Sequence, residues 1–180
     1  AQVWVMAPMV STTAEAAVFA EQVRGHGLSS GGVMVEVPAA AIRARHVAAV
    51  CDFMSIGTND LSQYTYAADR MAGELADLLD AWQPALLDLV RMTAEAGKAL
   101  GKPVGVCGEA ASDPLLALVF VGLGITSLSM APVSIRCRAR ARWTTARVQY
   151  AAAAVPEFNS TPRAAPGAGT HTARVHAIGN

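Results

Sequence analysis

The stretch Phe53-Met-Ser-Ile-Gly-Thr-Asn-Asp60 passes from a short apolar run through a glycine into three polar residues. A short, largely apolar run is typical of a strand covered on both faces, and the polar residues then lie where the next helix begins. Other short apolar runs recur along the chain, separated by longer segments that are rich in alanine. This alternation predicts repeated βα units and a parallel sheet, which is an α/β fold.

The same pattern, followed along the chain, predicts five strands and five helices. The clearest helix has Pro84 at its start and Gly101 and Pro103 beyond its end, which are start and stop signals. Glycines and serines over 25–32 predict a flexible connector before the second strand. The expected strands are 3–6, 33–37, 53–56, 104–107 and 127–130, and the expected helices are 12–24, 39–49, 61–68, 84–100 and 113–122.

The composition indicates one domain and a different terminal segment. With 180 residues, 53% of them hydrophobic, the chain can build a core, and a wholly disordered protein is excluded. The formal net charge of zero is a cancellation, because residues 1–135 hold 7 basic and 13 acidic side chains and residues 136–180 hold 7 and one. We therefore expect a domain over 1–135 and a basic, low-complexity, irregular tail over 136–180.

Several classes of protein are disfavoured by the same counts. The three cysteines form no Cys-x-x-Cys pair, so we expect neither a zinc site nor a disulfide framework. We expect the protein in a reducing cytoplasm. The longest apolar run, 115–125, is shorter than the roughly 20 residues of a membrane helix, so we expect no membrane span. The basic tail has few aromatic residues, which disfavours nucleic acid as a partner. The chain opens directly on a strand-like run, which indicates a fragment rather than a signal peptide.

Reactive side chains lie where the predicted strands end. Glu36, Asn59, Asp60 and Cys107 would all sit at the carboxyl edge of one parallel sheet, where α/β enzymes build their active sites. A carboxylate beside the core is costly without a cation, and two carboxylates with substrate oxygens suit Mg²⁺. The alternative for Glu36 or Asp60 taken alone is a helix-capping or solvated role.

Two further residues have both a chemical and a plain structural interpretation. Arg70, ten residues beyond Asp60, is able to bind a phosphate or a carboxylate, and the alternative is a surface ion pair with Asp69 or Glu74. Cys107 precedes a glycine at a strand end, and its alternative role is that of a small buried core residue.

Three segments together resemble the PEP-utilising enzymes. They are Gly32-Val-Met-Val-Glu-Val-Pro-Ala-Ala-Ala41, the run from Asp52 to Ala-Ala-Asp-Arg70, and Gly105-Val-Cys-Gly-Glu-Ala110. The Ala-Ala-Asp-Arg ending is more similar to enzyme I of the bacterial sugar phosphotransferase system than to pyruvate, phosphate dikinase or PEP synthase. The resemblance covers about residues 3–135. The alternative is that the chain is a fragment of a pyruvate, phosphate dikinase or of a PEP synthase.

The resemblance implies a (β/α)₈ barrel of which about five βα units are present. It implies Mg²⁺-dependent transfer of a phosphoryl group from phosphoenolpyruvate to a histidine on a separate domain, with release of pyruvate, as the first step of sugar transport. By position, Glu36 and Asp60 match the family's metal ligands. Asn59, the Asp60 backbone and Arg70 match its PEP-binding groups, and Cys107 matches the residue that protonates the enolate carbon.

The resemblance also implies partners that the chain does not itself contain. These are a phosphocarrier protein, reached through an amino-terminal region, and a second copy in a homodimer. With five of eight βα units we expect weak or no turnover from the chain alone, since open sheet edges favour association. A non-catalytic dimerisation or interaction remnant is therefore the alternative function.

Overall fold

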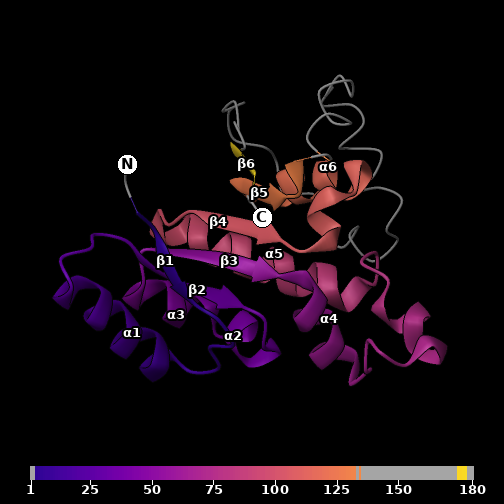
Figure 1. The fold of residues 1–180 in the computed structure, drawn as a ribbon, viewed down its shortest axis with the longest axis horizontal. Helices are drawn as coiled ribbons and strands as arrows, with labels where there is room; N and C mark the ends of the chain where they lie inside the picture. Colours follow the sequence, from indigo (N-terminus) through magenta and orange to yellow (C-terminus); the bar gives the residue numbers. More distant parts are fainter. Residues whose placement is uncertain (1–2, 133, 135–173, 178–180) are drawn as a thin grey trace.

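The protein is described by a computed structural model, in which residues 3–132, 134 and 174–177 are placed (Figure 1). No helix among these residues is both long and apolar enough to cross a membrane. In chain order the elements are β1 (Val5–Ala7), α1 (Thr13–Gly25), β2 (Gly31–Val35), α2 (Pro38–Ile42), α3 (Ala44–Val50), β3 (Phe53–Gly57), α4 (Thr58–Tyr66), η1 (Gly73–Leu79), α5 (Pro84–Leu100), β4 (Val104–Cys107), η2 (Glu109–Ser112), α6 (Pro114–Leu123), β5 (Ser127–Met130) and β6 (Arg174–Ala177).

The strands form one sheet in the order β1-β2-β3-β4-β5-β6, and every pair is parallel. Each strand therefore pairs with the next strand along the chain. A doubly wound sheet reverses its strand order at a switch point, whereas a (β/α)₈ barrel winds in one direction throughout. The predicted α/β class is confirmed, and the single winding is that of part of such a barrel.

The helices α1, α2, α3 and α5 pack against one another and cover one face of the sheet (Figure 1). Alternate side chains of the central strands point toward this layer and are fully buried there, among them Val33, Val35 and Ile56. The long helix α5 approaches β4 closely, since a Cβ at Gly97 would collide with the Val104 side chain. The core thus lies between the sheet and one helical layer.

The structure corrects the predicted bounds of the second strand. We expected a strand over 33–37 after a flexible connector, but β2 begins at Gly31, and Glu36 lies just beyond its end. Glycine occupies both of these strand positions because there is no room for a side chain. A Cβ at Gly31 would lie 3.2 Å from Val23 of α1, and a Cβ at Gly32 would lie 2.5 Å from the Phe53 ring.

The helices are largely where the sequence predicts them, with two differences. The expected helix 39–49 is two helices, α2 and α3, which meet at Arg43. Helix α4 starts at Thr58, three residues before the predicted start, so that Asn59 and Asp60 belong to its first turn. The strands β4 and β5 have the predicted bounds.

The predicted irregular tail, 136–180, lies outside the described residues except for 174–177. These four residues form β6, which pairs with β5. The sequence pattern did not predict this strand. The division of the chain into a domain over 1–135 and a tail stays a prediction.

Candidate functional site

The carboxyl ends of β2, β3 and β4 bring together the predicted site residues. Glu36 directly follows β2, Asn59 and Asp60 lie in the first turn of α4 after β3, and Cys107 is the last residue of β4. Gly57 at the end of β3 is paired with Cys107. The predicted convergence of these residues at one edge of the sheet is therefore what the structure shows.

Glu36 is the most buried carboxylate of this edge, with 6% of the residue exposed. The backbone N–H of Met9 donates a hydrogen bond to its Oε2 atom at 2.9 Å. Met9 has a φ of 54°, which is uncommon for a residue with a side chain. A Cβ at Gly57 would lie 2.6 Å from Glu36 Cγ, so glycine at the end of β3 leaves space for the carboxylate.

Burial, above all, raises the pKa of Glu36, and the Met9 N–H opposes this by stabilising the carboxylate. The negative charge of Asp60 and a hydrogen bond between the two carboxyl groups raise the pKa further. Two carboxylates in a partly dry site repel each other unless a proton or a cation lies between them. This pair therefore favours the binding of a cation.

Cys107 lies beside the same two carboxylates. Burial raises the pKa of its thiol, a hydrogen bond from Ser55 lowers it, and the charges of Glu36 and Asp60 raise it again. The net direction is upward, so the thiol keeps its proton at neutral pH. The Sγ–H donates to the carbonyl of Ile56 at 3.4 Å. A protonated thiol at this edge is a potential proton donor.

Arg70 reaches back to the site from the segment that follows α4. Its Nη1 lies 3.8 Å from Asp60 Oδ1, and 53% of its side chain is exposed. The alternative that we considered, an ion pair with Asp69 or Glu74, is not among the ion pairs of the described residues. The Arg70 guanidinium is thus next to the carboxylate pair and is accessible to an anionic ligand.

Thr58 and Ser55 also lie at this edge, although neither is among the individually predicted site residues. The Thr58 hydroxyl donates to the carbonyl of Cys107 at 3.1 Å, and the N–H of Glu109 donates to Asn59 Oδ1 at 3.4 Å. Their position in the sequence could have indicated a role at the site, because polar side chains inside or directly after an apolar strand need buried hydrogen-bond partners.

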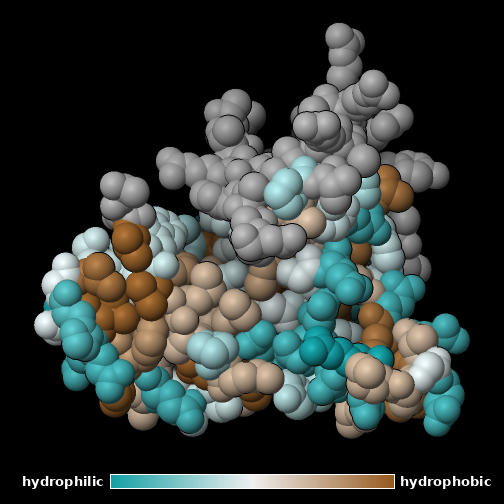
Figure 2. Space-filling view, viewed as in Figure 1, coloured by the Kyte–Doolittle hydropathy of each residue, from teal (hydrophilic) through white to brown (hydrophobic). Residues whose placement is uncertain are grey.

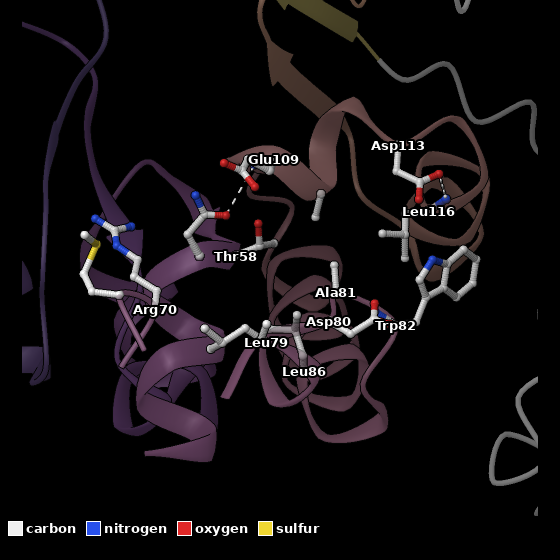
Figure 3. Close-up of a pocket in the computed structure, with 14 residues that line it drawn as sticks. Thr58, Arg70, Leu79, Asp80, Ala81, Trp82, Leu86, Glu109, Asp113 and Leu116 are labelled. Carbon is white, nitrogen blue, oxygen red and sulfur yellow. Dashed lines mark hydrogen bonds between the residues drawn. The ribbon is translucent and has the colours of Figure 1, made fainter. Parts of the chain in front are cut away.

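A pocket of about 540 Å³ adjoins the site (Figure 3). Asn59 and Arg70 line it, while Glu36, Asp60 and Cys107 do not. In the view of Figure 3, Arg70 and Trp82 lie on opposite sides, with Leu79 and Leu86 below and Glu109 above. The volume is within the range of sites for small molecules, roughly 300–1,000 Å³. Arg70 therefore lines this pocket and also lies next to Asp60 of the carboxylate pair.

The residues present fit Mg²⁺ better than a metal that needs a protein cage. The part of the chain that the structure describes holds no group of three or more His, Cys, Asp or Glu side chains that could enclose a metal ion. Mg²⁺ is usually held by one or two carboxylates, with substrate oxygens and waters as its other ligands. Glu36 and Asp60 would supply that pair, and their mutual repulsion is what a cation would relieve.

Comparisons with known proteins identify the family of the chain. The family model described as "PEP-utilising enzyme, PEP-binding domain" matches residues 1–149, which extends past the predicted boundary at 135. The phosphoenolpyruvate-protein phosphotransferase of Streptomyces coelicolor is 55% identical over 163 residues, covering 89% of this chain and 29% of the relative. That of Latilactobacillus sakei is 40% identical over 143 residues, covering 73% and 25%.

Two further similarities concern a longer protein and the fold. The multiphosphoryl transfer protein of Xanthomonas campestris is 45% identical over 123 residues, which are 67% of this chain and 15% of that protein. A citrate lyase from Burkholderia xenovorans has a TM-score of 0.56 at 19% identity, over 84% of this chain and 54% of that one, and supports the fold alone.

The chain spans less than a third of the length of these curated relatives. The family match nevertheless covers most of the chain, including every residue that we predicted for the site. Together with the parallel, singly wound sheet and the carboxylate pair at its carboxyl edge, it shows that this chain belongs to the PEP-utilising enzymes and carries their PEP-binding domain.

Proposed function

We propose that this domain binds phosphoenolpyruvate with Mg²⁺ in a cytoplasmic phosphoenolpyruvate-protein phosphotransferase. The observation that carries the proposal is the convergence of two carboxylates, a guanidinium and a protonated thiol at one sheet edge. These groups complement the substrate, which has an anionic phosphate, an anionic carboxylate and a carbon that accepts a proton. The names of the relatives match this chemistry.

Glu36 and Asp60 would hold the metal ion, and Asn59, the Asp60 backbone and Arg70 would bind the phosphate and the carboxylate. Mg²⁺, when bound, supplies neutralisation of the negative charge that builds up on the substrate oxygens. Arg70 adds a positive charge that is 3.8 Å from Asp60 and open to solvent. Phosphoryl transfer needs mainly such positioning and charge neutralisation, so few protein groups suffice.

The proposed reaction is a phosphoryl transfer followed by a proton transfer. The bond between phosphorus and the enol oxygen breaks, and a bond forms between phosphorus and a nitrogen of a histidine imidazole, which loses its proton to solvent. The remaining enolate takes the Sγ proton of Cys107 at its C3 carbon and becomes pyruvate. The thiolate recovers a proton from solvent. The histidine would belong to another part of the longer protein, which passes the phosphoryl group to a phosphocarrier protein of sugar transport.

The first test is calorimetric titration of PEP into the chain with and without Mg²⁺. We expect binding only with the metal, and we expect Asp60→Asn to lose it by more than about 100-fold, because even changes around a metal's ligands cost 10–100-fold. Asp77→Asn is the matched control, since this carboxylate of η1 is exposed and lines neither the site nor the pocket. Binding that survives EDTA or Asp60→Asn would contradict the proposed role of the carboxylate pair.

Self-association is the second candidate function, and the amino-terminal strand favours it. Within the described residues, β1 pairs on one side only, with β2. Val3, Trp4 and Met6 are 54%, 46% and 37% exposed there, and Figure 2 shows hydrophobic surface next to the amino terminus. An unpaired edge with exposed apolar side chains favours pairing with another chain, including a homodimer. Sedimentation equilibrium tests this, and a monomer at all concentrations would exclude it.

A further inference from the structure

The turn after β4 is held against the first turn of α4 by two hydrogen bonds. The Thr58 Oγ1 donates to the carbonyl of Cys107 at 3.1 Å. The N–H of Glu109 donates to Asn59 Oδ1 at 3.4 Å. These bonds join the backbone on both sides of Gly108 to residues that are about 50 positions earlier in the chain. The position of Cys107 relative to the α4 residues therefore depends on them.

Thr58 differs from two threonines that lie further inside helices, Thr65 and Thr93. Thr65 and Thr93 donate to carbonyls of their own helices, those of Leu61 and Leu89, at 2.6 and 2.8 Å. Such bonds to the residue four positions earlier are common for helical threonine. Thr58 is the first residue of its helix, is only 2% exposed, and instead donates to a strand 49 residues away. Its hydroxyl thus connects two elements of the site.

Gly108 allows this close approach. Its φ of +89° is in the region that favours glycine. A Cβ at this position would lie 2.8 Å from Thr58 Oγ1 and 3.1 Å from Asn59 Oδ1. The turn that carries Cys107 can therefore approach Thr58 and Asn59 because residue 108 has no side chain.

We propose that Thr58 is a positioning residue for Cys107, which holds the thiol at the place from which it protonates the enolate carbon. The role of Cys107 as proton donor rests on the proposed function, whereas the contact between Thr58 and Cys107 rests on the hydrogen bonds alone. Thr58 exchanges no proton in the reaction. Its hydroxyl fixes the carbonyl of Cys107, and with it the Cα and the direction of the side chain.

Two matched variants test the inference. Thr58→Val keeps the shape and removes the hydroxyl, whereas Thr58→Ser keeps the hydroxyl and removes a methyl group. The first readout is the alkylation rate of Cys107 by iodoacetamide, resolved by mass spectrometry, with the buried Cys51 as internal reference. Loss of a buried hydrogen bond should open the turn and speed the reaction about tenfold in Thr58→Val, with Thr58→Ser close to the wild type. Equal rates in all three chains would overturn the proposal.

The second readout separates positioning from binding. In D₂O with Mg²⁺, the site should exchange the C3 hydrogens of pyruvate, and Thr58→Val should slow this exchange about tenfold. Binding of oxalate, which imitates the two oxygens of the enolate, should stay unchanged, and Thr58→Ser should recover the exchange. Equal losses of exchange and oxalate binding would indicate a merely structural residue. A wild type that neither exchanges pyruvate nor binds oxalate would contradict the proposed function, and the alkylation rates would still decide the role of Thr58.

Discussion

The two edges of the sheet place a carboxylate in opposite electrostatic surroundings. At the amino edge, Asp52 precedes β3 and is surrounded by positive groups. Its Oδ2 accepts a hydrogen bond from the N–H of Gly31 at 3.0 Å and lies 3.4 Å from Arg24 Nη2. Lys102 Nζ lies 3.9 Å from its other oxygen. The charge of Asp52 is therefore compensated within the protein.

At the carboxyl edge, Glu36 has a second carboxylate beside it instead of a cation. Among the described residues, the Met9 N–H donates a hydrogen bond to Glu36 and stabilises its charged form, whereas the charge of Asp60 disfavours that form. Arg70 is near Asp60 but is about half exposed. Carboxylates with a raised pKa beside a like charge are typical of binding and catalytic sites. A carboxylate whose charge is compensated at the amino edge instead contributes to stability. One edge therefore compensates its carboxylate within the fold, and the other has a carboxylate pair for which we propose a ligand.

The largest effect should follow from exchanging the two carboxylates for amides. Glu36→Gln should weaken Mg²⁺-dependent PEP binding by more than about 100-fold, because it removes one of two proposed metal ligands. Asp52→Asn should leave the affinity within experimental error, since Asp52 lies at the opposite edge. Calorimetry with both variants measures this difference. Equal losses in the two variants would end the functional distinction between the edges.

Stability should show the reverse order. Asp52→Ala should lower the free energy of unfolding by about 1–2 kcal/mol, mainly because the N–H of Gly31 loses its acceptor. Glu36→Gln should leave it unchanged or raise it, because the repulsion from Asp60 disappears. Urea denaturation of both variants gives the comparison. A Glu36→Gln variant that is less stable than Asp52→Ala would contradict it.

The pH dependence should distinguish the edges as well. Glu36 has a raised pKa in the folded state, so between its unfolded and folded values the folded protein binds more protons than the unfolded chain. Its contribution to stability is then fully present below the ordinary glutamate pKa and is lost as pH rises through the raised value. Unfolding at several pH values without metal should show this fall, and Glu36→Gln should remove it. An identical pH profile in the variant would refute the assignment.

The smallest effect should come from the cations of the amino edge. Arg24 is 48% exposed at its side chain, and a surface ion pair at 3.4 Å contributes little. Arg24→Ala should cost at most about 0.5 kcal/mol, well below Asp52→Ala, which also loses the bond to Gly31. Thermal unfolding at low and high salt checks this. A cost that equals that of Asp52→Ala would mean that the ion pair, and not the hydrogen bond, stabilises this edge.

The placement of the site at one edge followed from local patterns. Short apolar runs predicted β4 and β5 with the bounds that the structure has. Because parallel strands end at the same edge, Glu36, Asp60 and Cys107 had to lie at one edge of the sheet once the βα alternation was established. Local hydrophobic pattern and strand direction were sufficient for this, and no long-range contact had to be known.

Tertiary structure alone decided the details that depend on close approach between distant segments. Gly31 and Gly32 had the composition of a connector, yet they pair as strand residues, and glycine is needed there because Val23 and Phe53 occupy the space beside them. The pairing of Arg70 with Asp60 and the bond from Thr58 to Cys107 could not be read from spacing, because each depends on how loops pack over the sheet. The sequence by itself therefore determined the parallel direction of the strands and the edge that carries the predicted site residues. Which side chains meet there was decided by packing, since the energy of a contact depends on distance in space and not along the chain.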